Sequence, residues 1–460
     1  MTSQVTFICK RTVVSTKPVQ PGKYHHPSVL DRLMEKNHLR IVYYYRSARD
    51  VEAGEMIRKL RESLSEMLTS FPVVTGRLQK NDKGHWMIKC NDAGVRMVEA
   101  RARGSVEEWL KNVDREKELK LIHWEDMFHK PYFWSTFYVQ VTEFEGGGLA
   151  IGFSCIHLLA DPICAITLIK AWADTTLAGT LHTPLFFHPL PPRRLGNKTP
   201  NHEPYTALIN HYKSSIDQTL STIPPLSTNN GKNATITLSF TDPMVRACMA
   251  MARTPAAPPH TSHDPSPFEA LAGLFWVCLS KIKGLHGNLL LDMSICLDIR
   301  KVLGLDKGYF GNCMVYNKVF HAEFSDNKNK LSEAARAIRQ VVKKMNDNEG
   351  IMDLIEWLEN NDHNSLPLMN GHDLICANLE GLDPYSAVFK DGFEPVHVSC
   401  YVEPVAGLGQ VLVLPSPPGE GAMSRLVMVT LSEVDAIKLC EDDLVLQFCP
   451  TITMGMMINN

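Results

Sequence analysis

The residues with the clearest capacity for chemistry are His157 and Asp161, four positions apart in the segment HLLAD. The histidine ends an apolar run typical of a buried strand, from which a side chain can be presented to a cleft. A histidine with a pKa near neutrality can take a proton from an alcohol or an amine. The spacing alone is weak evidence, because it recurs at His260 and Asp264 in a Pro-rich loop. Taken alone, His157 is more simply interpreted as a hydrogen-bonded core residue.

The elements on either side of this segment would hold it in place. Residues 136–143 and 149–156 have the pattern of paired strands, and three glycines at 146–148 give the backbone freedom that a hairpin needs. A helical run follows from 163 to about 177, and Pro162 suits its first turn because the missing N–H is not needed there. His157 is therefore predicted to lie between a strand and a helix.

The rest of the chain predicts an α/β protein with mixed sheets. Strands are expected at 39–45, 86–90, 95–99, 289–299, 389–402, 411–414 and 426–430, and helices at 51–69, 268–282, 331–345, 351–359 and 432–441. A length of 460 residues favours two domains, placed at 1–205 and 206–460. The stretch 184–233 is rich in Pro, Asn and Ser, which favours an irregular crossover between them.

Composition excludes several classes of function. A net charge of −3 gives no attraction to nucleic acid, and no apolar run reaches the roughly 20 residues that span a bilayer. The first residues lack the apolar stretch of a secretory signal. The 12 cysteines are scattered without C-x-x-C pairs, as expected for reduced thiols rather than metal ligands. We therefore expect a cytoplasmic protein with no metal.

Several motifs in one order along the chain resemble the BAHD acyltransferases, which move acyl groups from coenzyme A thioesters to alcohols and amines. They are FPVVTGRL at 71–78, HLLAD at 157–161, SPFEALAGLFWVCL at 266–279, LDIRKVLGLDKGYFGN at 297–312 and the GLG turn at 407–409. The resemblance covers essentially the whole chain. It implies two chloramphenicol-acetyltransferase-like domains, each a mixed sheet flanked by helices, with a channel between them.

The resemblance also implies roles for single residues. His157 would be the general base that takes the proton of the acceptor hydroxyl. Asp161 would pair with Arg300 of the D-x-R segment, and such an ion pair would lock the loop that carries the base. Acyl-coenzyme A would be a co-substrate, and no cofactor would stay bound.

The sequence departs from the family late in the chain. Where the family has DFGWG, this chain has Val405–Gly409, in which only Gly407 and Gly409 match. Cys400 stands where a tryptophan is expected, and Pro162 stands where catalytic members usually have glycine.

The segments YYYRSARD at 43–50, IKCNDAGVRMVEA at 88–100 and FEGGGLAIGFSCIHLLAD at 144–161 are similar to the eceriferum subgroup of cuticular wax synthesis.

That subgroup implies an accessory role in very-long-chain fatty acid elongation, with a ketoacyl-CoA condensing enzyme as partner and recruitment to the endoplasmic reticulum through that partner. Two alternatives stay open. One is a working acyl-CoA-dependent O- or N-acyltransferase that uses His157. The other is a protein that only binds coenzyme A esters. The intact histidine favours a working transferase, whereas the changed 405–409 segment favours the accessory role.

Overall fold

The computed structural model describes residues 4–20, 22–46, 53–125, 134–180, 185–192, 206–221, 232–253, 264–285, 289–306, 308–319, 330–361, 373–405 and 407–455. The chain divides into two compact units. Unit 1 comprises Met1–Leu190, Asp306–Asn312 and Asp383–Pro404, and unit 2 comprises Pro191–Leu305, Cys313–Leu382 and Val405–Asn460. Two short segments from the second half of the chain therefore belong to unit 1. A single boundary between 205 and 206 does not describe this exchange of segments.

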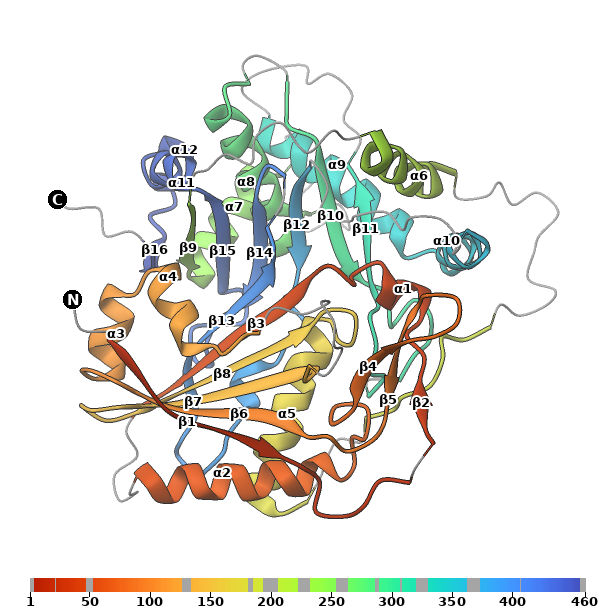
Figure 1. Ribbon diagram of the computed structural model, residues 1–460. Coiled ribbons are helices and arrows are strands. Elements are labelled where there is room, and N and C mark those ends of the chain that lie inside the picture. The colour runs from red at the N-terminus through yellow and green to blue at the C-terminus, as the bar shows by residue number, and fades with distance from the viewer. Residues whose placement is uncertain are drawn as a thin grey trace. The chain divides into compact units, whose positions relative to one another are not determined.

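Unit 1 is built on a six-stranded mixed sheet in the order β1-β6-β7-β8-β3-β13 (Figure 1). Its strands are β1 (Val5–Val13), β6 (Val95–Ala102), β7 (Phe137–Phe144), β8 (Leu149–Ile156), β3 (His38–Tyr45) and β13 (Pro395–Glu403). β6 and β7 pair in parallel and every other pair is antiparallel. The paired strands expected at 136–143 and 149–156 are β7 and β8, in a register that matches Phe137 with Cys155.

Both faces of this sheet are covered, which is why every residue of β7 and β8 is buried. On one face, apolar side chains of the sheet pack with α2 (Ala53–Leu68) and α5 (Pro162–Ala178) around Phe153 and Trp172. On the other face, polar side chains bond to the segment that follows α4: the Gln140 amide donates to the Lys120 carbonyl oxygen at 2.9 Å, and the Ser154 hydroxyl donates to that of His123 at 2.6 Å.

The remaining elements of unit 1 are short. Strands from the first ninety residues form a second, three-stranded sheet in the order β2-β5-β4. The elements are β2 (Tyr24–His25), β4 (Arg77–Lys80), β5 (Trp86–Lys89), α1 (Val29–Arg32), α3 (Val106–Asn112), α4 (Arg115–Glu118), η1 (Leu119–Leu121) and η3 (Pro384–Ser386).

Unit 2 has a seven-stranded mixed sheet in the order β11-β10-β12-β14-β15-β9-β16 (Figure 1). Its strands are β9 (Asn233–Phe240), β10 (Met293–Asp298), β11 (Met314–Lys318), β12 (Leu374–Asn378), β14 (Gln410–Pro415), β15 (Arg425–Ser432) and β16 (Thr451–Met454). Its helices are α6 (Thr206–Ser221), α7 (Asp242–Met251), α8 (Pro267–Ile282), α9 (Lys330–Met345), α10 (Asn348–Asn360), α11 (Glu433–Cys440) and α12 (Asp443–Leu446). α8 opens with the expected capping box of Ser266 and Glu269.

The predicted class, α/β with mixed sheets flanked by helices, is confirmed. One local expectation is wrong, because the stretch 184–233 contains α6. Residues 206–221 hold neither Pro nor Gly, and Leu208 and Tyr212 are buried one helical turn apart. His260 of the second H-x-x-x-D lies outside the described residues. Among the helices that are described, none is both long and apolar enough to cross a membrane.

Candidate functional site

His157 directly follows β8, and its peptide is fixed on both sides. Its N–H donates to the Asn37 carbonyl oxygen at 2.9 Å, and its own carbonyl oxygen accepts from the side-chain Nδ2 of Asn312 at 2.7 Å. Asn37 immediately precedes β3, whose first residue, His38, is matched with Ile156 of β8. The pairing of β8 with β3 thus fixes His157 at the end of these two strands.

The imidazole of His157 is 2% exposed, and this burial lowers the pKa of His157 below its ordinary value. The nearby Asp161 carboxylate, the residue's own carbonyl oxygen and the Asn312 side chain oppose this effect on the pKa more weakly. The ring is therefore neutral at neutral pH, the form that can accept a proton. Within the described parts of the chain, its Nδ1 makes no hydrogen bond of ordinary geometry.

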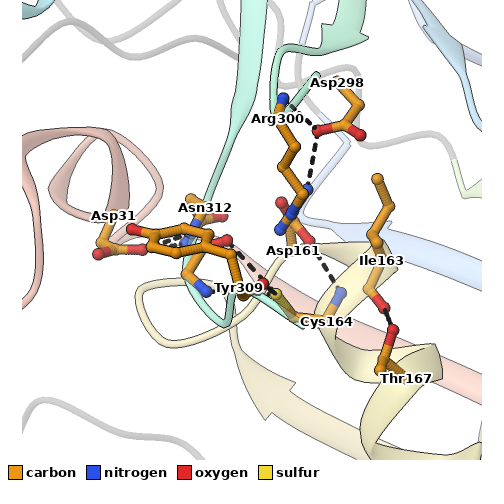
Figure 2. A network of polar contacts seen from close by, with 10 residues as sticks. Asp31, Asp161, Ile163, Cys164, Thr167, Asp298, Arg300, Tyr309 and Asn312 are labelled. Carbon is orange, nitrogen blue, oxygen red and sulfur yellow. Dashed lines mark hydrogen bonds and ion pairs between the residues drawn. The ribbon is translucent and has the colours of Figure 1, made fainter. Parts of the chain in front are cut away.

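Asp161 caps the helix that follows. It is the N-cap residue of α5, its Oδ1 accepts from the Cys164 N–H at 2.9 Å (Figure 2), and Pro162 occupies the first turn as expected. The carboxylate is fully buried. A capping carboxylate also interacts favourably with the positive end of the helix dipole. The sequence predicted an ion pair for Asp161, whereas this capping role was not foreseen.

Arg300 is buried and belongs to unit 2. Its Nη1 lies 2.9 Å from Oδ1 of Asp298, the aspartate of the D-x-R segment (Figure 2). Its main-chain N–H donates to the same oxygen at 3.1 Å. Asp161 belongs to unit 1, so the ion pair between Asp161 and Arg300 stays a prediction.

Two residues that the sequence did not single out, Asn312 and Asp31, complete the surroundings of His157. Asn312 ends the YFGN segment, and its Nδ2 and main-chain N–H both donate to Oδ1 of Asp31, at 2.8 and 2.7 Å (Figure 2). Asp31 lies in α1, where it forms a capping box with Ser28. The S-x-x-D spacing at 28–31 was the available signal for the box, but it does not point to Asn312.

The other residues of YFGN are held by Cys164. Its Sγ lies 3.6 Å from the carbonyl oxygen of Tyr309 (Figure 2). The same sulfur accepts from the Gly311 N–H at 3.3 Å and lies 3.4 Å from the Gly311 carbonyl oxygen. The main chain of Phe310 also donates to the Phe186 carbonyl oxygen at 2.9 Å. The first turn of α5 thus positions both Asp161 and the segment that presents Asn312.

The late segment forms a turn between β13 and β14. Gly407 and Gly409 have φ values of 69° and 125°, a region that glycine adopts without steric strain. A Cβ on Gly409 would lie 2.4 Å from a side-chain carbon of Leu431. Upstream, Cys400 is buried in β13, and burial raises the pKa of its thiol to about 12. Cys400 is therefore a core thiol and not a nucleophile.

No group of three or more His, Cys, Asp or Glu side chains suited to a metal ion occurs in the described part of the chain. The twelve cysteines are all free thiols.

Comparisons with known proteins agree with this architecture. The chain is 26% identical to Protein ECERIFERUM 26-like of Arabidopsis thaliana over 93% of each chain. Vinorine synthase matches in structure with a TM-score of 0.70 and 18% identity, over 98% of this chain and 100% of that one. TRI101 of F. graminearum, solved with coenzyme A and T-2 mycotoxin, matches with a TM-score of 0.67 and 14% identity, over 94% and 100%. The Transferase family model matches residues 3–443, so the chain belongs to this family, that of the BAHD acyltransferases.

Proposed function

We propose that this protein promotes very-long-chain fatty acid elongation for cuticular wax, as an accessory factor to a ketoacyl-CoA condensing enzyme. Its similarity to an eceriferum protein along most of both chains supports a wax-related role. The observation that carries the accessory role is the segment 400–409. There the family's Asp, Phe and Trp are absent, while Gly407 and Gly409 keep the turn.

The residues that remain in this segment serve the fold. The glycines serve the backbone, because Gly409 has no room for a Cβ against Leu431. Cys400 serves the core, because it is buried and its thiol pKa is about 12. A protein under selection for its shape would keep such residues, and the loss of the family's Asp, Phe and Trp supports relaxed selection for transfer chemistry.

Under this proposal, acyl-coenzyme A binds as a ligand of the pair formed with the condensing enzyme. A structural neighbour solved with coenzyme A supports binding of this ligand class. The condensing enzyme would supply the association with the endoplasmic reticulum, and this chain would work from the cytoplasmic side.

The alternative is an active acyl-CoA-dependent O- or N-acyltransferase. One observation favours it: His157 is a neutral imidazole whose peptide is fixed by Asn37 and Asn312. In that reaction His157 takes the acceptor's proton while the acceptor attacks the thioester carbonyl, and the thiolate of coenzyme A leaves. Asp161 and Arg300 would then hold the loop that carries the base.

The test is coexpression in yeast with a very-long-chain condensing enzyme, with acyl chain lengths measured by gas chromatography. The accessory function predicts longer products than the condensing enzyme makes alone, and no new acyl ester when this chain is expressed by itself. Purified protein that transfers acyl groups from coenzyme A thioesters to an alcohol, without any condensing enzyme, would establish the alternative. Unchanged chain lengths in the coexpressing strain would refute the accessory function.

A further inference from the structure

The contacts of Asn312 fix which way its side-chain amide points. Its Nδ2 lies 2.8 Å from Oδ1 of Asp31 and 2.7 Å from the carbonyl oxygen of His157. A carboxylate and a carbonyl oxygen only accept hydrogen bonds, so the atom that faces both must be the donor nitrogen. The amide oxygen Oδ1 therefore occupies the other corner of the group.

Asp31 holds the amide in this orientation. One of its oxygens accepts from the main-chain N–H and the side chain of Asn312, and the other accepts from the Ser28 N–H at 2.6 Å. Asp31 is 3% exposed and Asn312 is 1% exposed. A flipped amide would set a carbonyl oxygen against both the carboxylate and the His157 carbonyl, which a buried site does not tolerate.

Two buried atoms are left without an ordinary partner. Among the described residues, neither Oδ1 of Asn312 nor Nδ1 of His157 makes a hydrogen bond of ordinary geometry. Buried polar atoms are nearly always hydrogen-bonded in native proteins. The carbonyl oxygen of His157 and the Asn312 side chain both stabilise the protonated form of the His157 ring, as acceptors would, and the carbonyl oxygen is already engaged by Nδ2 of Asn312. One atom is an acceptor, and the other can carry a proton.

We propose that Asn312 is a positioning residue that selects the tautomer of His157, with Oδ1 accepting from an Nδ1–H and Nε2 left as the unprotonated nitrogen. Asp31 is the support behind it, since its carboxylate keeps the amide from turning. A partner of this kind on one ring nitrogen decides which nitrogen is basic. The inference concerns the ring itself, and it holds whether the protein acts as an accessory factor or as a transferase.

The test is nitrogen NMR of the full chain labelled with [15N]histidine. The spectra are recorded above the pH at which the His157 imidazolium becomes the neutral imidazole, which has a single N–H. A His157→Ala spectrum identifies the two signals of the ring. We expect Nδ1 at the shift of a protonated nitrogen and Nε2 at that of an unprotonated one. Asn312→Ala should abolish this pattern. Asn37→Ala is the matched control, because His157 bonds only to the main chain of Asn37, and it should leave the pattern intact.

Two results overturn the proposal: an Nε2–H tautomer in the wild type, or an Nδ1–H tautomer that persists in Asn312→Ala. If the alanine variant does not fold, Asn312→Ser replaces it, because a hydroxyl can still donate to Asp31 while lacking the amide oxygen, and the same loss is expected. The spectra are independent of chain elongation, so the proposed function and this inference can fail separately.

Discussion

Three consecutive tyrosines in β3 should respond differently to loss of their hydroxyl groups. Tyr43, Tyr44 and Tyr45 are each fully buried. The Tyr44 hydroxyl donates to Glu118 at 2.8 Å, and that of Tyr45 donates to the Ala387 carbonyl oxygen at 2.9 Å. The Tyr43 hydroxyl has no hydrogen-bond partner among the residues that the structure describes.

The magnitudes follow from what each phenylalanine leaves behind. Tyr45→Phe leaves a buried carbonyl without its donor, which costs about 1–3 kcal/mol of unfolding free energy. Tyr44→Phe removes a bond to a buried carboxyl group, and such bonds to charged partners contribute about 1.5–3 kcal/mol. Tyr43→Phe removes a buried hydroxyl that bonds to nothing described, so the folded state should gain up to roughly 1–3 kcal/mol.

Urea unfolding followed by circular dichroism measures all three variants, with midpoints compared at an unchanged slope. The expected order of stability is Tyr43→Phe at or above the wild type, with Tyr45→Phe and Tyr44→Phe below it. If Tyr43→Phe loses as much stability as Tyr45→Phe, its hydroxyl has a partner and our description of this face of the sheet is wrong.

Three further predictions concern residues of unit 1. Burial raises the pKa of Glu118, so the stability that this group contributes is present below its ordinary pKa of about 4.3 and is lost as the pH rises through its pKa in the folded protein. Urea midpoints of the wild type should therefore fall over this pH range, and those of Glu118→Gln should not. Gly152→Ala places a Cβ 2.0 Å from a carbonyl oxygen of η1 and should lose roughly 1–3 kcal/mol or more, whereas Gly381→Ala, with open space, should lose little; equal midpoints would contradict this packing. Asp161→Ala should lose about 0.5–2 kcal/mol through its cap, or ~3–5 kcal/mol if the predicted ion pair with Arg300 is also broken; thermal unfolding of Asp161→Asn, which keeps the cap, isolates the second part.

Several strands with strong apolar patterns could be predicted from the sequence, whereas the exposed β1 could not. β3, β7 and β8 were expected because β-branched and aromatic residues fill them and both of their faces are covered. β1 was missed because it pairs only with β6 at the sheet edge and most of its residues are exposed, which leaves no apolar alternation. The strand expected at 389–402 begins only at Pro395, after a turn in which Gly392 has a φ of 71°.

The candidate site could likewise be predicted only in part. His157 and Asp161 could be found because one short segment carries both, with a strand before it and a helix after it. The contact of Asp31 with Asn312 could not, because 281 residues separate them and neither has a local pattern that names the other. Composition also cannot show that 306–312 and 383–404 join unit 1, since that depends on long-range pairing such as that of β13 with β3.

The most direct test of the accessory function is the chain-length profile of a condensing enzyme coexpressed with the His157→Ala variant. The substitution should spare the fold, because both hydrogen bonds that fix residue 157 use its main chain and survive in alanine. The accessory function predicts elongation within about twofold of the wild type, since no proton transfer depends on the ring. A general base contributes typically 10²–10⁴-fold to a rate, so a fall of that size with normal protein levels would contradict the accessory function and favour a transferase that uses His157 as its base.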